Sequence, residues 1–437
     1  MKRKIKIAIF NIIYFLIYIC CIFKFYKTIA FLIKISLRQI KTIKQNKKGK
    51  VFFILHKSNG TEEIINAYKN KTSKYLFYEM KRSTLKTICN FFLKGLEDYN
   101  YKSFLREHDD RKMEYKKALE IIFNELKKTT KLHGIINFNI FYKSDFELAK
   151  VCKMLDIKFI TFHKEGIHTP NQSINAKKVY RFLNDRYSGD KIAVSNFDEK
   201  KRIVNSGIFY KNKITVVGSP RISYFCNLKP NKIEKKVKIV FFQYTKKRGN
   251  IINKNIKVRN IYDKPDISWN KTELACVKVL IELCKKYPNT LEVIFKIREN
   301  VYNAPNFLSS LKLPINFNIS SSPTAYKYIE NSNIVLSYNS STLIEGIAAK
   351  KLVILPFFDR PIDWRRCLNV KGAAKIISTR TKLKKYIESF INEQSKFNKI
   401  YSFKSIIRSR KKIIDKYFFN SDDKASKRMI NFLEKFN

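Results

Sequence analysis

The chain has 437 residues, 45% hydrophobic and 29% charged, which excludes a disordered chain and makes a single ordinary core improbable. The formal net charge of +53 indicates either an anionic partner, such as a membrane surface or a phosphorylated substrate, or only an AT-rich coding bias. The lysines are spread along the chain, which argues against nucleic-acid binding, and the eight cysteines form no CxxC pair or zinc-spaced cluster.

The first 48 residues form a hydrophobic and basic segment that we expect to associate with a membrane. Residues 7–23 carry no charge, and this run lies at the lower length limit for a membrane span. A short span, a helix in the membrane interface and a buried first helix remain open. Lys and Arg crowd the downstream side, so the positive-inside rule predicts that the domains after it lie at the cytoplasmic face of the inner membrane. No small-residue cleavage site follows, which argues against a removable signal peptide.

Between residues 49 and 228, apolar runs alternate with amphipathic helical patterns, as in parallel strands covered by helices. Strands are predicted at residues 50–56, 75–80, 134–140, 157–162, 191–195 and 213–218. Helices are predicted at residues 101–128, 144–155 and 197–207. Several cysteines lie in these apolar patterns, which predicts buried thiols in a reducing compartment. The segment is predicted to be a Rossmann-like domain.

The polar stretch at residues 228–236 indicates a linker, after which the alternation restarts. Strands are predicted at residues 237–243, 291–297, 315–320, 333–337, 352–356 and 373–377, with a helix at 272–287. Residues 237–400 are therefore predicted to form a second Rossmann-like domain, and residues 401–437 a basic C-terminal helix. The predicted fold class is α/β, with two Rossmann-like domains that face a cleft and follow a hydrophobic N-terminal helix.

The stretch NSSTLIEG begins where the strand at residues 333–337 ends and a helix starts. A helix N-terminus offers backbone N–H groups and positive potential, and small hydroxylated side chains let a phosphate come close. We therefore predict that Asn339, Ser340, Ser341 and Thr342 bind the phosphates of a nucleotide, although Ser and Thr are also common helix caps. Glu345, one turn later, accepts hydrogen bonds from a ribose or only favours the helix dipole.

Two other strand ends of the second domain are predicted to complete this phosphate site. Lys296 and Arg298 lie at the end of the strand at residues 291–297 and would neutralise a phosphate, although two cations are common in so basic a chain. Gln243 ends the first strand of this domain and would line the same site.

In the first domain, the loop TFHKEGIHTPNQS directly follows a strand and contains two of the five histidines of the chain. His163 and Glu165 would place an acid/base group at the cleft, and the alternative is a solvated loop with a turn glycine. Metal binding by the two histidines is not favoured, because no third ligand is apparent nearby. Four further residues are assigned to the cleft and the acceptor: Lys164, His168, Gly218 and Arg221.

Taken in order, the motifs KIAVSN, KITVVGSPR, VFFQYT, VIFKIR and SYNSSTLIEG resemble bacterial surface-polysaccharide glycosyltransferases of the GT-B fold, over residues 150–380. The nearest resemblance is to surface carbohydrate (capsule) biosynthesis proteins, and Kdo-transferases, sialyltransferases and CDP-glycerol transferases are more distant. The resemblance implies sugar transfer from a nucleotide-sugar donor to a glycan or lipid-linked acceptor, without a metal or other cofactor. It also implies that the second domain holds the nucleotide and the first holds the acceptor.

The family's phosphate-binding Ser/Thr motif matches residues 340–342, and the acid after it matches Glu345. In the sialyltransferase relatives, a pair of acidic residues followed by glycine supplies the catalytic base. Here only one acid is present, which leaves Glu165 as the candidate base with His163 beside it. The His-Pro pair of those relatives is replaced at residues 297–298, which puts a CMP-sugar donor in doubt.

Two alternatives stay open on the same scaffold. One is a transferase for a polyol phosphate of the CDP-glycerol type. The other is a non-catalytic polysaccharide-assembly protein, which the single acid and the missing His-Pro pair favour. The hydrophobic N-terminus and the basic composition favour a lipid-linked acceptor at an anionic membrane surface.

Overall fold

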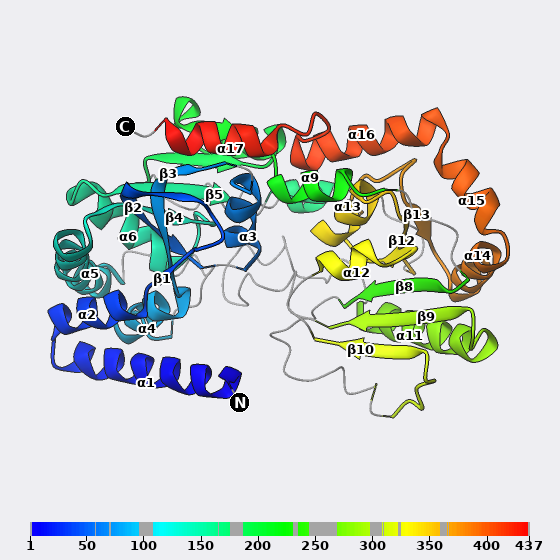
Figure 1. The fold of residues 1–437 in the computed structure, drawn as a ribbon, viewed down its shortest axis with the longest axis horizontal. Coiled ribbons are helices and arrows are strands. Elements are labelled where there is room, and N and C mark those ends of the chain that lie inside the picture. The colour runs from blue at the N-terminus through cyan, green and yellow to red at the C-terminus, as the bar shows by residue number, and fades with distance from the viewer. Residues whose placement is uncertain are drawn as a thin grey trace. The chain divides into compact units, whose positions relative to one another are not determined.

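The computed structural model describes residues 2–56, 58–69, 71–95, 108–164, 166–174, 187–229, 235–243, 269–297, 308, 310–321, 325–358, 365 and 367–435. The chain divides into two compact units, each with its own sheet (Figure 1). Unit 1 comprises Met1–Gly166, Ala176–Arg221 and Lys424–Asn437, and unit 2 comprises Ile167–Asn175 and Ile222–Asp423. Two predicted site residues, Glu165 and Arg298, lie outside the described residues.

Unit 1 contains a seven-stranded sheet with the order β1-β3-β2-β4-β5-β6-β7. Strands β2 to β7 run parallel, and the edge strand β1 is antiparallel to β3. The strands are β1 (Arg38–Gln39), β2 (Gln45–Leu55), β3 (Ser73–Met80), β4 (Leu132–Asn137), β5 (Lys158–His163), β6 (Lys191–Val194) and β7 (Ile214–Val216). The helices are α1 (Lys2–Ile22), α2 (Tyr26–Ser36), α3 (Ser58–Ala67), α4 (Arg82–Phe92), α5 (Asp109–Thr130), α6 (Lys143–Met154), α8 (Phe197–Asn205) and α17 (Ala425–Glu434).

Strand β4 is shorter than the predicted strand at residues 134–140. The Asn137 amide donates to the Asn139 carbonyl at 2.8 Å, and the Asn139 side chain accepts from the Phe141 N–H at 2.7 Å. These local side-chain bonds compete with the sheet for the backbone, so the chain turns away after Asn137. The remaining predicted strands of unit 1 are confirmed with small shifts at their ends.

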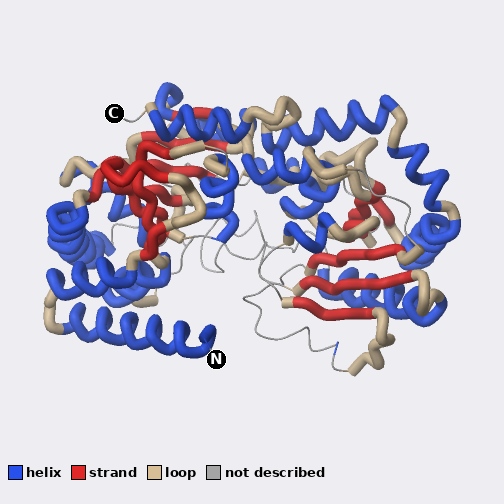
Figure 2. Tube along the Cα trace, in the orientation of Figure 1, coloured by secondary structure: helices blue, strands red, loops and turns tan. Residues whose placement is uncertain are grey.

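Unit 2 contains a six-stranded, all-parallel sheet with the order β10-β9-β8-β11-β12-β13. Its strands are red in Figure 2. The strands are β8 (Val237–Phe242), β9 (Leu291–Lys296), β10 (Phe317–Ser320), β11 (Ile334–Leu336), β12 (Leu352–Pro356) and β13 (Lys375–Ile377). The helices are α11 (Trp269–Lys286), α12 (Tyr326–Glu330), α13 (Ser341–Ala348), α14 (Arg380–Asn392), α15 (Gln394–Tyr401) and α16 (Lys404–Phe418). Helix α9 (Pro220–Cys226) begins in unit 1 and ends in unit 2.

Both strand orders contain a point at which the direction of strand addition reverses. In unit 2 the chain goes from β8 outward to β9 and β10, and then returns to the other side of β8 with β11. In unit 1 the corresponding reversal lies between β2 and β4. Open α/β sheets bind ligands at the carboxyl ends of the strands beside such a switch point. The two sheets confirm the α/β prediction and fit a GT-B-like two-domain fold.

The C-terminal segment differs from the single basic helix predicted at residues 401–437. Helix α16 ends at Phe418, and the next residue, Phe419, has a left-handed backbone with φ of 42°. The Ser421 N–H donates to the Asp415 carboxylate at 2.8 Å. The chain then enters unit 1 again as α17, whose Phe432 ring lies 5.5 Å from that of Phe162. The end of the chain therefore completes the core of unit 1.

The hydrophobic N-terminal segment forms α1 and α2, which belong to unit 1. Helix α1 packs on α4, where the Tyr18 and Phe91 rings meet edge to face at 5.6 Å, and α2 packs on α5. Among the described residues, no helix is long and apolar enough to cross a membrane.

Candidate functional site

The switch point of unit 2 brings together residues from three strand ends. Ser337 directly follows β11, Gln243 directly follows β8, and Lys296 is the last residue of β9. The Gln243 N–H donates to the Lys296 carbonyl at 3.0 Å, which fixes these two ends side by side. Because β11 pairs with β8 in parallel, the start of α13 lies at the same edge of the sheet. The predicted Gln243 and Lys296 therefore share this edge with the predicted Ser/Thr motif.

Three hydroxyl groups form a cluster at this edge, and we call Ser337, Ser340 and Thr342 the hydroxyl cluster. The Ser337 Oγ lies 3.0 Å from the Ser340 Oγ and 2.7 Å from the Thr342 Oγ1, and the last two oxygens lie 2.5 Å apart. The sequence analysis did not single out Ser337, because the residue was counted as the end of a strand. Ser341, which was predicted, is the first residue of α13 and lies beside the cluster.

Helix capping does not account for the hydroxyl cluster. Ser340 has the extended N-cap backbone, with φ of −145° and ψ of 168°, but its side chain makes no hydrogen bond to a backbone N–H of the first turn of α13 and bonds the Thr342 hydroxyl instead. Two other helices of the described chain are capped in the ordinary way: Asn196 accepts from the Glu199 N–H in α8, and Thr379 accepts from the Lys382 N–H in α14. The first turn of α13 thus lacks the side-chain acceptor that its N-cap residue would usually supply, and an anion could take that place.

The remaining predicted residues of unit 2 have mixed surroundings. The Asn339 Oδ1 accepts from the Leu368 N–H at 3.0 Å, so this side chain fastens the turn before α13 to a neighbouring loop. The Lys296 side chain is buried, and its Nζ donates to the Ile297 carbonyl at 2.6 Å. Glu345 is 1% exposed. Its contact with a ribose stays a prediction.

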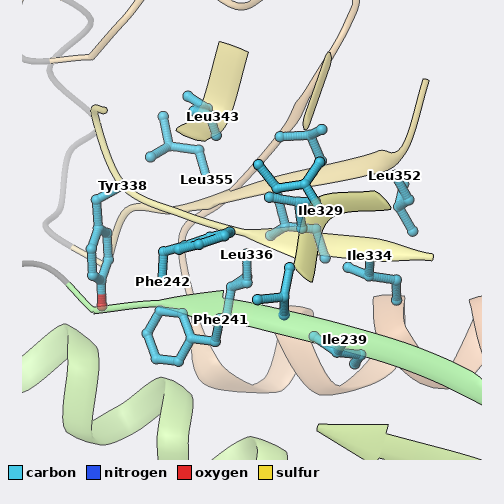
Figure 3. Packing of buried hydrophobic residues seen from close by; sticks show 14 of the residues in the cluster. Ile239, Phe241, Phe242, Ile329, Ile334, Leu336, Tyr338, Leu343, Leu352 and Leu355 are labelled. Carbon is cyan, nitrogen blue, oxygen red and sulfur yellow. The ribbon is translucent and has the colours of Figure 1, made fainter. Parts of the chain in front are cut away.

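A buried apolar core packs around the strands that lead to the hydroxyl cluster, and Figure 3 shows part of it, including Phe241 and Tyr338. The Tyr338 ring, one residue beyond Ser337, meets the Phe241 ring of β8 edge to face at 5.8 Å. Burial raises the pKa of Tyr338 well above its ordinary value, so the phenol stays neutral. A Cβ at Gly346 would lie 3.1 Å from side-chain atoms of Val335 and Val353, so this glycine lets α13 lie close to the sheet.

In unit 1, the predicted His163 is enclosed in the protein. Its Nε2 lies 3.3 Å from the Glu199 Oε1, and Glu199 also forms an ion pair with Arg202 one turn along α8. His163 and Glu199 are 1% and 0% exposed. The Asn196 side chain, which caps α8, also donates to the Gly166 carbonyl at 3.1 Å. This placement favours a structural role of His163 beside Glu199 over contact with a substrate, and its catalytic role stays a prediction.

Two of the predicted acceptor residues meet at a carboxylate that the sequence analysis missed. The Glu63 Oε1 of α3 lies 3.3 Å from the Lys164 Nζ and 3.8 Å from the Arg221 Nε. Gly218, just before Arg221, has a left-handed backbone with φ of 81°, which the turn after β7 requires. His168 belongs to unit 2 and lies half-buried there. The adjacent acids Glu62 and Glu63, a few residues after a predicted strand, were the signal that could have pointed to Glu63.

A second missed group lies at the switch point of unit 1, where β2 ends. The His56 Nδ1 lies 2.5 Å from the Glu79 Oε1 of β3 and 3.4 Å from the Thr61 Oγ1 of α3. The Lys81 Nζ lies 3.6 Å from the same Glu79 oxygen. In this arrangement the carboxylate orients the imidazole and leaves Nε2 for another partner.

The His56–Glu79 pair predicts a pH dependence. The hydrogen bond from His56 lowers the pKa of Glu79 from 4.5 to about 2. A lowered folded-state pKa stabilises the protein above the unfolded-state pKa, and this contribution is lost as the pH falls from about 4.5 to about 2. We expect wild type to be more stable than Glu79→Gln at about pH 5 and the difference to shrink towards pH 2, as measured by calorimetry. A difference that stays constant over this range would contradict the pairing.

The described residues contain no group of three or more His, Cys, Asp and Glu side chains arranged to hold a metal ion. All eight cysteines are free thiols, and all but the half-buried Cys226 are buried.

No family profile and no curated protein matches the sequence. Solved structures do share the fold. A UDP-GlcNAc 2-epimerase from Neisseria meningitidis bound to UDP-GlcNAc has a TM-score of 0.50 at 14% identity, over 88% of this chain and 99% of that one. A putative UDP-N-acetylglucosamine 2-epimerase from Listeria monocytogenes has a TM-score of 0.50 at 10% identity, over 88% and 96%. The S. aureus protein MnaA with UDP has a TM-score of 0.50 at 12% identity, over 90% and 97%. Likeness at these identities establishes the fold alone.

Proposed function

We propose that this protein is a GT-B-type glycosyltransferase that moves a sugar from a nucleotide-sugar donor to a surface-polysaccharide or lipid-linked glycan acceptor. The observation that carries the proposal is the start of α13, where the hydroxyl cluster stands beside a helix N-terminus that its N-cap side chain leaves uncovered. This feature lies at the switch point of a Rossmann-like sheet, the place where such sheets bind nucleotides. The ligands of two structures with the same fold, UDP-GlcNAc and UDP, support a nucleotide sugar as the ligand here.

In the proposed reaction, a base takes the proton of an acceptor hydroxyl, whose oxygen attacks the anomeric carbon of the donor sugar. The bond between that carbon and the phosphate oxygen breaks, and negative charge develops on the leaving phosphate. The N–H groups at the start of α13, the hydroxyl cluster and Lys296 would stabilise this charge. The candidate bases are Glu165, from the family resemblance, and Glu63 and His56, from their positions at the carboxyl edge of the sheet of unit 1.

Two other functions remain candidates on specific grounds. The names of the structures that share the fold favour epimerisation of a nucleotide sugar. The resemblance to CDP-glycerol transferases favours transfer of a polyol phosphate. A non-catalytic assembly protein is the third possible outcome, and it would neither epimerise the nucleotide sugar nor transfer its sugar.

We also propose that the protein is located at the cytoplasmic face of the inner membrane.

The experiment that tests the function has two stages. A thermal-shift panel of the full chain with UDP, CMP, CDP, GDP and their sugars identifies the nucleotide, because a ligand that binds only the folded state raises its stability. The sugar nucleotide is then incubated with and without membrane lipid extract. A transferase should release the free nucleotide only when the lipid extract supplies an acceptor. An epimerase should convert the sugar of the nucleotide sugar without any extract. No shift with any nucleotide would contradict the proposal.

Lys296→Met tests the cation of the proposed site. We expect the Kd for the best nucleoside diphosphate to rise about 10-fold, because a buried charge-assisted hydrogen bond contributes about 1.5–3 kcal/mol. The control is Lys236→Met, which removes a half-exposed cation paired with Glu292 at the opposite end of β8. Titration calorimetry measures the Kd of both variants. Equal Kd values would show that Lys296 does not contribute to nucleotide binding.

A further inference from the structure

The N-terminal helices α1 and α2 expose an unusual amount of apolar surface. Twenty large hydrophobic side chains are exposed in the described part of the chain, and half of them lie between residues 9 and 35. Phe15 is 64% exposed on α1, and Phe31 is 59% exposed on α2. Ile9, Ile12 and Leu16 of α1 and Ile35 of α2 are exposed as well, whereas the partly exposed Tyr18 packs on Phe91 of α4. Scattered exposed apolar residues are ordinary, but ten large ones on or between two helices that contact each other indicate an interaction surface.

The opposite side of the same two helices is fixed to unit 1. Ile17, Cys21, Ile29 and Ile33 are buried, where α1 contacts α4 and α2 contacts α5. Figure 1 shows α1 and α2 side by side at the edge of unit 1. Lys24, with a left-handed φ of 57°, turns the chain between them. The two helices therefore form a pair with one side held by the protein and the other side uncovered.

Charge identifies what would cover this side. Residues 1–61 contain 14 Lys and Arg and no Asp or Glu. Lys24, Lys27, Lys34 and Arg38 are exposed, and they lie on or directly beside the two helices. Apolar side chains together with cations and without acids match a lipid surface that carries anionic headgroups. A second copy of this chain would bring the same positive charge to the contact, which disfavours it as the partner.

We propose that α1 and α2 are a monotopic docking surface that lies in the plane of an anionic lipid bilayer, with the exposed side chains of residues 9–35 inserted at the headgroup level. The inner side of the pair stays packed on α4 and α5, so the surface is part of unit 1 and not a separate anchor. This inference does not depend on the proposed sugar transfer, because it uses no residue of the nucleotide site.

The test is flotation of the full chain with lipid vesicles. Wild type is expected to float with vesicles that contain about a third phosphatidylglycerol, and to bind pure phosphatidylcholine vesicles at least about 10-fold more weakly. Phe15→Glu/Phe31→Glu should reduce binding to the anionic vesicles at least about 10-fold. The matched control, Phe197→Glu/Phe403→Glu, adds the same charge at side chains that are 58% and 50% exposed elsewhere, and should bind like wild type.

Three results would overturn the proposal. The first is equal flotation of Phe15→Glu/Phe31→Glu and wild type, with circular dichroism showing that both are folded. The second is protection of the N-terminus from protease added outside sealed vesicles, which would mean that the segment crosses the bilayer. The third is absence of vesicle binding together with a concentration-dependent dimer that the same double variant abolishes, which would assign the surface to a second copy.

Discussion

Ser340→Ala/Thr342→Ala is expected to weaken nucleotide binding by about 100-fold or more, while the protein stays folded. The variant removes two of the three hydroxyls that lie within 3.0 Å of one another at the start of α13. A hydrogen bond to a charged group contributes about 1.5–3 kcal/mol, so two of them approach or exceed the free energy of a 100-fold change. Titration calorimetry with the best nucleoside diphosphate measures the Kd of wild type and variant.

The control for this variant is Thr379→Ala in the same unit. Thr379 is a true N-cap, because its side chain accepts from the Lys382 N–H of α14 at 3.2 Å. Removing such a cap lowers stability by about 1 kcal/mol and should leave nucleotide affinity unchanged. If the Ser340/Thr342 variant behaves like Thr379→Ala, with a loss of stability and no loss of nucleotide affinity, the hydroxyl groups have a structural role. That result would favour the alternative of a non-catalytic assembly protein.

The location of this site could be predicted from the sequence because its signals are local. An apolar run, a group of small polar residues and a helical pattern follow one another, and β11 and α13 lie where this order indicates. The order of the strands could not be predicted, because it depends on contacts between segments far apart in the chain. The switch points, and with them the closeness of Gln243 and Lys296 to α13, became visible only in the sheet.

The buried ion pairs could not be predicted for the same reason. Glu63 meets Lys164 and Arg221, and Glu199 meets His163, across long sequence separations. His163 was predicted as a site residue because histidine is rare in this sequence. The rarity of a residue type does not indicate whether a given side chain is buried. Helix α3 was not predicted because its apolar residues are few, whereas Leu85, Ile88, Cys89 and Phe92 have helical spacing and could have indicated α4. The residues of α17 were predicted to be helical, but nothing local indicates that they return to unit 1.

Glu199→Ala is expected to lower the free energy of unfolding of unit 1 by about 3–5 kcal/mol. The variant leaves Arg202 and His163 in the protein interior without the carboxylate that faces both of them. Removing one member of a buried ion pair costs this much because the remaining charge stays desolvated. A urea titration followed by circular dichroism measures the loss, and hydrogen exchange of peptides from β5 and α8 assigns it to unit 1.

Two further variants distinguish the stability effect of breaking the buried ion pair from the effect of losing any glutamate. Glu282→Ala removes a half-exposed acid that pairs with Lys384 at 3.1 Å, and exposed pairs contribute about 0–1 kcal/mol. Glu199→Leu/Arg202→Leu replaces both charges and should recover most of the loss, because an apolar pair of similar volume needs no compensation. If the double variant is as unstable as Glu199→Ala, the loss comes from His163 or from packing. Because the cap residue of α8 also bonds the Gly166 carbonyl, a folded double variant would then show whether this Asn196–Gly166 hydrogen bond needs the charge pair.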